Sequence, residues 1–452
     1  MYFKLALGNV KRSVRDYSLY FATLAFAACL LYSFTAAGDY LLALDLTEEQ
    51  RGIYESANMV TQAFSVFSVL VFAFLIAYAS RFILRRRSRE FAVYGLLGME
   101  PRSISCILAI EGCLVGLGAL VFGIAVGTVI SPLFGAIAAF VFEAPWQPLL
   151  VWSPQAAEWT ALCFAGIMAF ATFLSVRDMK KRTLIQLLAA DRAPERPKVM
   201  NRWSTRVRAI LAVVLLGIVW GCCIVQPIAF IVWILPMGTA AVLATAIVFR
   251  LAARAWPRRA RRHPERYWKG LRYFTTRQVE SHASASANAM ACICALLAVG
   301  ICMMVAGFAF SVGMRTPDST IMDYHAMAPI GFVGIFYGAT FLVSAAAVLA
   351  LQQLADAADS AQRFRMLSNL GCDDEMLRSS IRVQTGIYFA APLAFALVHA
   401  VFGLMLVGFL ALILGSSSFA FIVGGVIAAT VAFLTAYYLL ACRECERILI
   451  AP

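Results

Sequence analysis

The cysteine pair in Cys442-Arg-Glu-Cys445 has the spacing of two metal ligands. A closed zinc site needs four ligands, and the sequence has no second cysteine pair with this spacing. Most of the other ten cysteines lie in or beside apolar runs, where a free cysteine behaves as a small apolar residue. We therefore expect no metal site in this chain.

Two ionisable residues lie inside apolar runs. Glu111 lies about two helical turns into its run, where it could relay protons or pair with nearby arginines; we favour pairing. His399 lies in the middle of its run and could titrate, although a lone histidine there more often makes one interhelical hydrogen bond. Paired charges at the middle of the runs are absent, which argues against a proton- or sodium-driven carrier.

The sequence contains no phosphate-binding loop of the form G-x-x-x-x-G-K-[ST]. Any ATP site that serves this protein is therefore expected on another chain. We expect neither a catalytic residue nor a cofactor here.

The elements that position these residues are long apolar runs. The composition is 62% hydrophobic and 14% charged, whereas soluble domains average about half apolar and about a quarter charged. Ten runs approach or exceed the roughly 20 residues that a helix needs to cross a bilayer. They are Tyr17–Ala36, Met59–Ile83, Ser103–Ile130, Trp159–Val176, Ile210–Val225, Phe230–Phe249, Ala287–Phe310, Ile330–Leu351, Thr385–Leu414 and Phe419–Leu440. The sequence thus predicts an all-α membrane protein with ten transmembrane helices.

The distribution of basic residues predicts the orientation of these helices. With the N-terminus in the cytoplasm, 36 of the 38 Lys and Arg residues fall in inner segments, and only Arg51 and Arg315 fall outside. This positive-inside pattern places both ends of the chain in the cytoplasm and accounts for the net charge of +13. It implies affinity for anionic membrane lipid and gives no indication of nucleic-acid binding.

Two segments resemble each other and indicate an internal repeat. Arg89–Gly98 follows the second run and Gln362–Gly371 follows the eighth, with Phe91 matching Phe364 when the glycines are aligned. Each copy has an apolar residue at every third position and ends at glycine, a common helix terminator. The apolar residues and glycines are Phe91, Tyr94, Leu97, Gly98, Phe364, Leu367, Leu370 and Gly371, and Met99 follows the first copy.

A second similarity precedes the first and seventh runs, where Leu7–Val10 resembles Thr276–Val279. Both belong to amphipathic basic stretches suited to lie in the membrane interface. We infer two parallel repeats, 1–190 and 266–452, each with an interfacial helix and four spans. Residues 191–265 supply a linker and a central two-helix hairpin.

The two short helices that end at Gly98 and Gly371 have two interpretations. Their apolar stripes could be exposed surfaces that a cytoplasmic partner covers, or Phe91, Tyr94 and Leu97 could pack beneath the bundle. The third run favours docking, because its 28 residues are long enough to project past the bilayer.

The chain resembles the FtsX-like permeases of ABC transporters, in particular the BceB-type branch linked to resistance against peptide antibiotics. The order and spacing of several short segments carry this resemblance over nearly the whole chain. They are Phe3–Arg12, Arg89–Met99, Arg182–Leu188, Tyr267–Leu271, Arg277-Gln278, Gln353-Leu354, Leu370-Gly371 and Pro392–His399.

The resemblance implies that two copies of a separate ABC ATPase dock on the two short helices and move them during ATP hydrolysis. A sensor kinase or a peptide ligand would be a further partner. The branch carries a large extracellular domain between its seventh and eighth spans, whereas this chain has only Ser311–Pro329 there. The acidic segment 37–58 could attract a cationic peptide or could simply complement the positive inner side.

We therefore expect a permease subunit in the cytoplasmic membrane of a bacterium that serves export, extraction or mechanical signalling connected with antimicrobial peptides or lipid-linked compounds. The alternatives are a non-transporting membrane regulator driven by an ABC ATPase and a secondary carrier.

The orientation can be tested by cysteine labelling of intact cells, in a background without the native cysteines. A membrane-impermeant reagent should reach cysteines placed at Thr47 and Ser319 but not at Ser88 and Ser204, because the first two lie outside in the predicted topology. Labelling at Ser88 would reverse the orientation.

Overall fold

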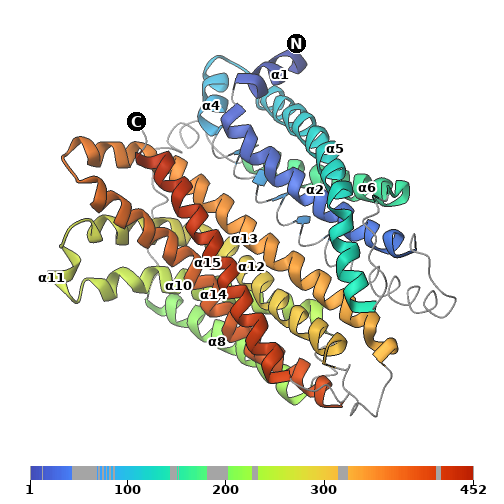
Figure 1. Cartoon of the computed structure of the whole chain (residues 1–452). Helices are drawn as coiled ribbons and strands as arrows, with labels where there is room; N and C mark the ends of the chain where they lie inside the picture. The colour runs from blue at the N-terminus through green and yellow to red at the C-terminus, as the bar shows by residue number, and fades with distance from the viewer. Residues whose placement is uncertain are drawn as a thin grey trace. The chain divides into compact units, whose positions relative to one another are not determined.

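The structure is a computed structural model (Figure 1), and it describes most of the chain. The described residues are 2–12, 14–42, 87–142, 150, 152–180, 202–226, 233–313, 324–413 and 419–450, with scattered positions between 69 and 84. Every regular element within these residues is a helix. The all-α class predicted from the apolar runs is therefore confirmed for this part of the chain.

The chain divides into two compact units. Unit 1 comprises residues 1–194 with 324–333, and unit 2 comprises 195–323 with 334–452. The helices of unit 1 are α1 (Tyr2–Arg12), α2 (Val14–Leu42), α4 (Ser88–Leu96), α5 (Pro101–Phe142) and α6 (Pro154–Lys180). Within this unit α2 packs along α5, α6 contacts both, and α1 and α4 pack against α5 (Figure 1).

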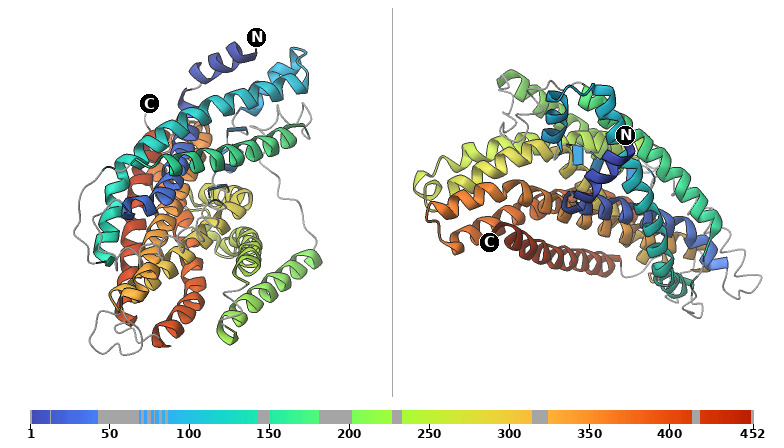
Figure 2. Two further views of the ribbon diagram at one scale, coloured as in Figure 1. Left: turned by 90° about the vertical axis from the view of Figure 1, so that its right-hand side faces the viewer. Right: turned by 90° about the horizontal axis from the view of Figure 1, so that it is seen from above.

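Small residues allow α2 and α5 to approach closely. Gly123 and Gly127 are one turn apart on α5 and face α2. A Cβ atom on Gly123 would lie 2.6 Å from the Ala25 carbonyl oxygen, and one on Gly127 would lie 2.8 Å from the Tyr32 ring. Such small-xxx-small contacts are a common way for membrane helices to pack, since lipid provides no hydrophobic drive between them. Figure 2 shows that α5 bends toward its end, and Pro132 lies inside this part of the helix.

Unit 2 is built around α12, which packs against α10, α14 and α15, while α8 packs against α10 and α14. Its helices are α8 (Arg202–Val225), α10 (Ile234–Ala260), α11 (Pro264–Tyr267), α12 (Arg272–Ser311), most of α13 (Tyr324–Asn369), α14 (Asp374–Ile413) and α15 (Phe419–Ile450). The helices of the predicted central hairpin, α8 and α10, thus belong to this unit.

Two predicted helix boundaries are wrong. The interfacial helix expected before the seventh span is continuous with that span in the 40-residue α12. Neither Gly nor Pro occurs between Arg272 and Val299, so nothing in this stretch interrupts the helix. Likewise, the second short helix is the last part of the 46-residue α13 rather than a separate element.

Eight helices of the described chain are long and apolar enough to cross a membrane, and they match the third to tenth predicted spans. The first predicted span contains a shorter apolar stretch, Tyr20–Ser33, within α2. The second predicted span lies mostly outside the described residues. The protein is therefore a multi-pass membrane protein, and its ten-helix repeat arrangement remains a prediction.

The crossing of α12 and α13 in unit 2 allows a test of this packing. Gly307→Ala would place a Cβ atom 2.3 Å from the Ile335 backbone nitrogen, and Gly338→Ala would place one 2.6 Å from that of Met304. Because backbone must move in both cases, we expect each variant to lower the thermal unfolding temperature in detergent. Gly424→Ala is the control, because nothing lies within 4 Å of its Cβ position and alanine favours the helix by about 1 kcal/mol. Unfolding at the wild-type temperature in both crossing variants would contradict this packing.

Candidate functional site

Arg87 lies at the start of α4 and connects four helices of unit 1. Its guanidinium forms an ion pair with Glu111 on α5 and donates a hydrogen bond to the Tyr17 hydroxyl on α2. It also donates to Glu90 on α4, with 2.6 Å from Nη2 and 2.9 Å from Nε to Oε2. Asn9 on α1 donates from Nδ2 to Glu111 Oε1 at 2.8 Å. The helices α1, α2, α4 and α5 thus meet at one ion pair.

This ion pair is removed from water, since the side chains of Arg87 and Glu111 are each 1% exposed. Burial alone would lower the pKa of the Arg87 guanidinium, but attraction to the Tyr17 oxygen and to Glu111 and Glu90 raises it. Both Glu111 oxygens accept hydrogen bonds, which a buried carboxylate needs to offset its lost hydration. Glu111 is therefore paired with an arginine, the interpretation that the sequence favoured.

Phe91 lies against the same guanidinium, on the side of α4 that faces the bundle. The Arg87 side chain sits 5.2 Å from the Phe91 ring centroid and 5.3 Å from that of Tyr17. Phe91 is 1% exposed and packs in a core with Ile104 and Leu108 of α5. The expectation that Phe91 belongs to an exposed stripe is therefore wrong, because its ring covers the buried ion pair.

The exposed apolar residues lie further along the same helix and just beyond it. Val93 is 45% exposed, Leu96 61% and Leu97 76%, while Tyr94 and Met99 pack at the edge of the core. We call residues 93–99 the tip of unit 1. Its exposed surface is apolar, although it includes only Leu97 of the three residues in the predicted stripe.

The end of α13 in unit 2 has the same division between buried and exposed residues. Phe364 is 1% exposed and meets the Phe274 ring edge to face at 5.5 Å. Leu367 packs at the edge of the core, whereas Met366 is 53% exposed and Leu370 is 81% exposed. We call residues 366–372 the tip of unit 2.

Both tips end in the same backbone geometry. Gly98 and Gly371 have φ angles of +87° and +86°, a left-handed conformation that glycine adopts without strain. The amide of Met99 donates to the Tyr94 carbonyl at 3.0 Å, and that of Cys372 to the Leu367 carbonyl at 3.2 Å. This six-residue closure is the Schellman helix end, as the glycines predicted.

The cores beneath the two tips use matching positions of the sequence. Seven core residues of unit 1 have a counterpart in the core of unit 2 at a constant separation of 273 positions. The pairs are Leu84 and Ala357, Phe91 and Phe364, Tyr94 and Leu367, Met99 and Cys372, Ile104 and Leu377, Leu108 and Ile381, and Val176 and Leu449. Five of these seven pairs lie outside the two short segments that indicated the repeat.

The ion pair itself has no charged counterpart at these matching positions. The positions of Arg87 and Glu111 correspond to Ser360 and Gln384 in unit 2. Gln278, which the second sequence similarity aligns with Asn9, donates to Ser360 Oγ at 2.6 Å. Unit 2 thus has neutral side chains at both matching positions, and Arg363 also donates to Ser360 Oγ at 2.8 Å.

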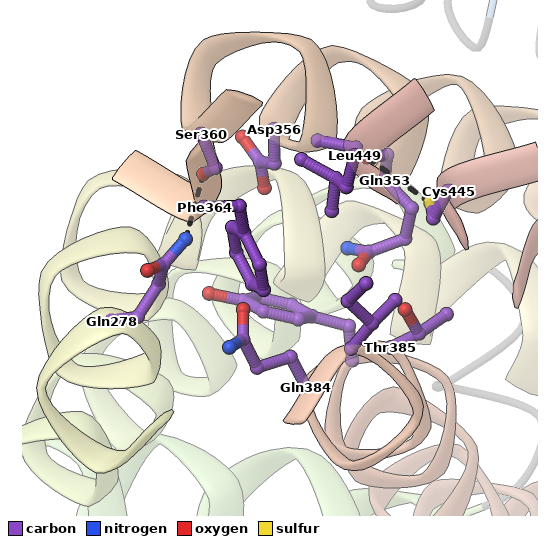
Figure 3. Close-up of a pocket in the computed structure, with 12 residues that line it drawn as sticks. Gln278, Gln353, Asp356, Ser360, Phe364, Gln384, Thr385, Cys445 and Leu449 are labelled. Carbon is purple, nitrogen blue, oxygen red and sulfur yellow. Dashed lines mark hydrogen bonds between the residues drawn. The ribbon is translucent and has the colours of Figure 1, made fainter. Parts of the chain in front are cut away.

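A small polar cavity lies beside these residues in unit 2 (Figure 3). Phe364, Ser360 and Gln384 line it, and Gln353 and Asp356 point toward its middle. Its volume of about 30 Å³ gives room for about two water molecules. The Gln353 amide is 5% exposed, and its Nε2 donates to no other described residue. The cavity therefore suits water or another small polar molecule and is too small for a peptide.

His399 joins three helices of unit 2 by two hydrogen bonds rather than the one expected. The Trp220 Nε1–H on α8 donates to His399 Nδ1 at 3.1 Å, so the remaining nitrogen carries the proton. Nε2 lies 2.9 Å from Thr245 Oγ1 on α10, whose hydroxyl donates to the Ala241 carbonyl at 2.7 Å. This arrangement holds a neutral imidazole, so His399 fastens α8 and α10 to α14.

Cys442 and Cys445 are buried free thiols on α15. Cys445 packs in the core beneath the tip of unit 2, and its Sγ donates to the Gln353 carbonyl at 3.8 Å. No three His, Cys, Asp or Glu residues within the described chain are grouped to hold a metal ion. Both cysteines therefore serve packing in this structure.

Sequence reasoning did not identify Arg87, Tyr17 or Asn9 as site residues. It predicted an arginine partner for Glu111, but five arginines lie between positions 81 and 89. Only the fold shows which of them points inward. One sequence feature did point to Asn9, namely its alignment with Gln278. Asn9 donates to Glu111 in unit 1, and Gln278 donates to Ser360 in unit 2.

Known proteins resemble parts of this chain. Residues 63–184, which contain α4, Arg87 and Glu111, match the family model described as FtsX-like permease C-terminal. The bacitracin export permease protein BceB of Bacillus subtilis is 29% identical over 192 residues, which is 42% of this chain and 29% of that protein. BceB of Halalkalibacterium halodurans is 28% identical over 186 residues, or 40% of this chain and 28% of that protein. The uncharacterized ABC transporter permease YvcS of Bacillus subtilis is 26% identical over 216 residues, which is 47% of this chain and 31% of that protein.

Within this all-helical membrane protein, residues 63–184 therefore resemble a permease domain. The chain contains an FtsX-like permease domain and is homologous to BceB-type permeases. The matched segments span less than a third of the length of these relatives.

A double-mutant cycle tests the buried ion pair. Arg87→Met or Glu111→Leu alone leaves one buried charge without its partner, so we expect each to cost about 3–5 kcal/mol of stability. The double variant should cost no more than either single change, because it buries no charge. The measurement is the unfolding free energy of the detergent-solubilised protein.

The exposed pair Arg382–Glu446 provides the control for this cycle. Arg382→Met removes a 2.7 Å ion pair in which the arginine side chain is 60% exposed, and it should lower stability far less than loss of the buried pair, because water screens exposed charges. Additive losses in the Arg87 and Glu111 variants would show that the two residues are not coupled.

Proposed function

We propose that this chain is the permease subunit of an ABC transporter, working with a separate ATPase subunit in the cytoplasmic membrane. The observation that carries this proposal is the FtsX-like match over residues 63–184, because the matched segment encloses α4, the ion pair and the tip of unit 1. The relatives named as bacitracin export permeases support the same class. In this role the chain binds no nucleotide itself and holds no catalytic residue.

The two tips are the proposed docking surfaces for two ATPase copies. Leu97 and Leu370 are among the most exposed apolar side chains of their units, at 76% and 81%. Neither lies within a candidate membrane span, so lipid does not cover them. An apolar pocket on a soluble ATPase would remove both residues from water, as interface anchors require. The internal repeat, with domains 1–190, 191–265 and 266–452, would supply one tip per copy.

The ion pair of unit 1 gives this docking a mechanical consequence. A force on the tip acts on α4, and Arg87 connects the start of α4 to Glu111 on α5 and Tyr17 on α2. Asn9 extends the connection to α1. Displacement of α4 would therefore move these helices together, because separating them would leave buried charges unpaired. ATP-driven motion would reach the spans through this cluster.

The substrate class that we propose is antimicrobial peptides or lipid-linked compounds, moved by export or extraction or detected by mechanical signalling. The short connection between α12 and α13 favours a second candidate, a non-transporting regulator. α12 ends at Ser311 and α13 begins at Tyr324, so this connection cannot hold a large outer domain. A regulator would use the same tips and pass the motion to a partner such as a sensor kinase. A secondary carrier is less favoured, since Glu111 is already paired with Arg87.

The docking proposal predicts a defined loss of ATPase binding. Leu97→Asp and Leu370→Asp should each weaken co-purification with a co-expressed candidate ABC ATPase that the wild-type permease retains, and the double variant should abolish it. Both side chains are exposed, so stability of the isolated permease should change by only about 0.5 kcal/mol. The matched controls Leu97→Met and Leu370→Met keep the apolar surface and should retain the ATPase.

Phe91→Ala and Phe364→Ala are expected to behave differently from the tip variants. Because both rings are buried, their removal should cost about 3–5 kcal/mol of permease stability. Wild-type retention of the ATPase by the Leu97→Asp/Leu370→Asp variant would exclude the tips as docking sites. ATP hydrolysis that is unaffected by adding the permease would favour a carrier.

A further inference from the structure

The corner that joins α10 to α12 in unit 2 carries a dense positive charge. Residues 250–272 contain nine Lys and Arg residues and one acidic residue, Glu265. Four of the arginines fall within five positions at the end of α10 and in the turn that follows, and all four are exposed: Arg258, Arg259, Arg261 and Arg262. Among the residues that the structure describes, none forms an ion pair with these four.

Aromatic rings lie next to this charge in the turn between α11 and α12. The Trp268 and Tyr273 rings stack with centroids 5.1 Å apart and an angle of 13° between their planes. The buried Tyr267 ring meets both edge to face, at 5.3 Å and 5.5 Å. Gly270, with φ +60°, allows the chain to turn between the two stacked residues. The stack is thus fixed from below, and Trp268 remains 67% exposed.

The position of this corner relative to the candidate spans places it at a membrane surface. It begins in the last turn of the candidate span Pro236–Ala260 and lies before the span Ser286–Ser311. Trp256 is 52% exposed at the end of α10. Trp203 is 74% exposed at the start of α8, which packs on α10. Exposed tryptophans at the ends of spans are typical of the headgroup region, where one side of the ring is apolar and the other is hydrated.

We propose that this corner, Arg258–Arg262 with Trp268 and Tyr273, binds the headgroup of an anionic phospholipid such as phosphatidylglycerol. Four adjacent arginines repel one another unless anions neutralise them, and a cluster of basic residues directly after a span is the pattern that recognises anionic lipid. The ring stack supplies an apolar surface beside the phosphate, suited to the glycerol and upper acyl chain. An acidic protein would match the charge but would not account for exposed tryptophans at the ends of spans.

The experiment compares two variants that remove the same charge. Arg261→Gln/Arg262→Gln removes two exposed arginines of the corner. The control Arg378→Gln/Arg382→Gln removes two exposed arginines of the same unit that already pair with Glu446. Each purified permease is placed in phosphatidylcholine nanodiscs in which about one lipid in five is phosphatidylglycerol, the lipid used as the probe. The affinity for spin-labelled phosphatidylglycerol is then measured at low and high salt.

The wild type and the control should bind phosphatidylglycerol with similar affinity and more tightly than phosphatidylcholine. The Arg261→Gln/Arg262→Gln variant should bind about thirtyfold more weakly, since each basic residue near the surface contributes about fivefold. Trp268→Ala should also weaken binding, but with an unchanged salt dependence, because it removes no charge. An equal loss of phosphatidylglycerol affinity in both double variants would overturn the proposed site. Full displacement of the lipid by inorganic phosphate at equal concentration would also overturn it.

Discussion

A guanidinium cannot be buried without anions around it, and the inner structure of unit 1 follows from this constraint. Arg87 is 1% exposed and lies between Glu111, Glu90 and the Tyr17 hydroxyl, with the Phe91 ring packed against it. Glu111 comes from α5, Tyr17 from α2, and Glu90 and Phe91 from α4. The cluster therefore fixes how α4 sits on α2 and α5, and through Asn9 it also fixes α1. The apolar tip stays exposed because Phe91, not Leu97, fills the space over the ion pair.

Each unit packs a tip on a similar apolar core, but the polar residues beside the two cores differ. Their cores share seven positions at one separation, and both tips end at a glycine of positive φ. Unit 2 nevertheless has Ser360 and Gln384 where unit 1 has the charged pair, and it leaves a small polar cavity. Neutral side chains such as Ser360 and Gln384 can rearrange their hydrogen bonds with water at lower cost than a buried ion pair can. We expect the second tip to move more independently of its bundle than the first.

Much of the fold follows from the sequence, because long apolar runs and positive φ glycines have few structural solutions. Eight spans, the ends at Gly98 and Gly371 and the restart of α5 at Pro101 were all predictable. The direction in which each side chain of a short helix points could not be predicted from the sequence. Their spacing assigns Phe91 and Leu97 to one stripe. In the structure, the nine-residue helix and the tight turn after it place Phe91 in the core and Leu97 in solvent. The choice of Arg87 among five neighbouring arginines likewise depends on tertiary contacts.

Hydrogen–deuterium exchange of α4 in the Glu111→Gln variant is the most direct test of the claim that the ion pair holds this helix on its bundle. Amide exchange in residues 88–96 should rise about tenfold or more, since even 1.4 kcal/mol of lost local stability gives this factor. Exchange in residues 361–369 at the end of α13 in unit 2, the segment that corresponds to α4, should stay at the wild-type rate. Unchanged exchange in α4 would show that apolar packing alone holds the helix, and the central role assigned to Arg87 would be wrong.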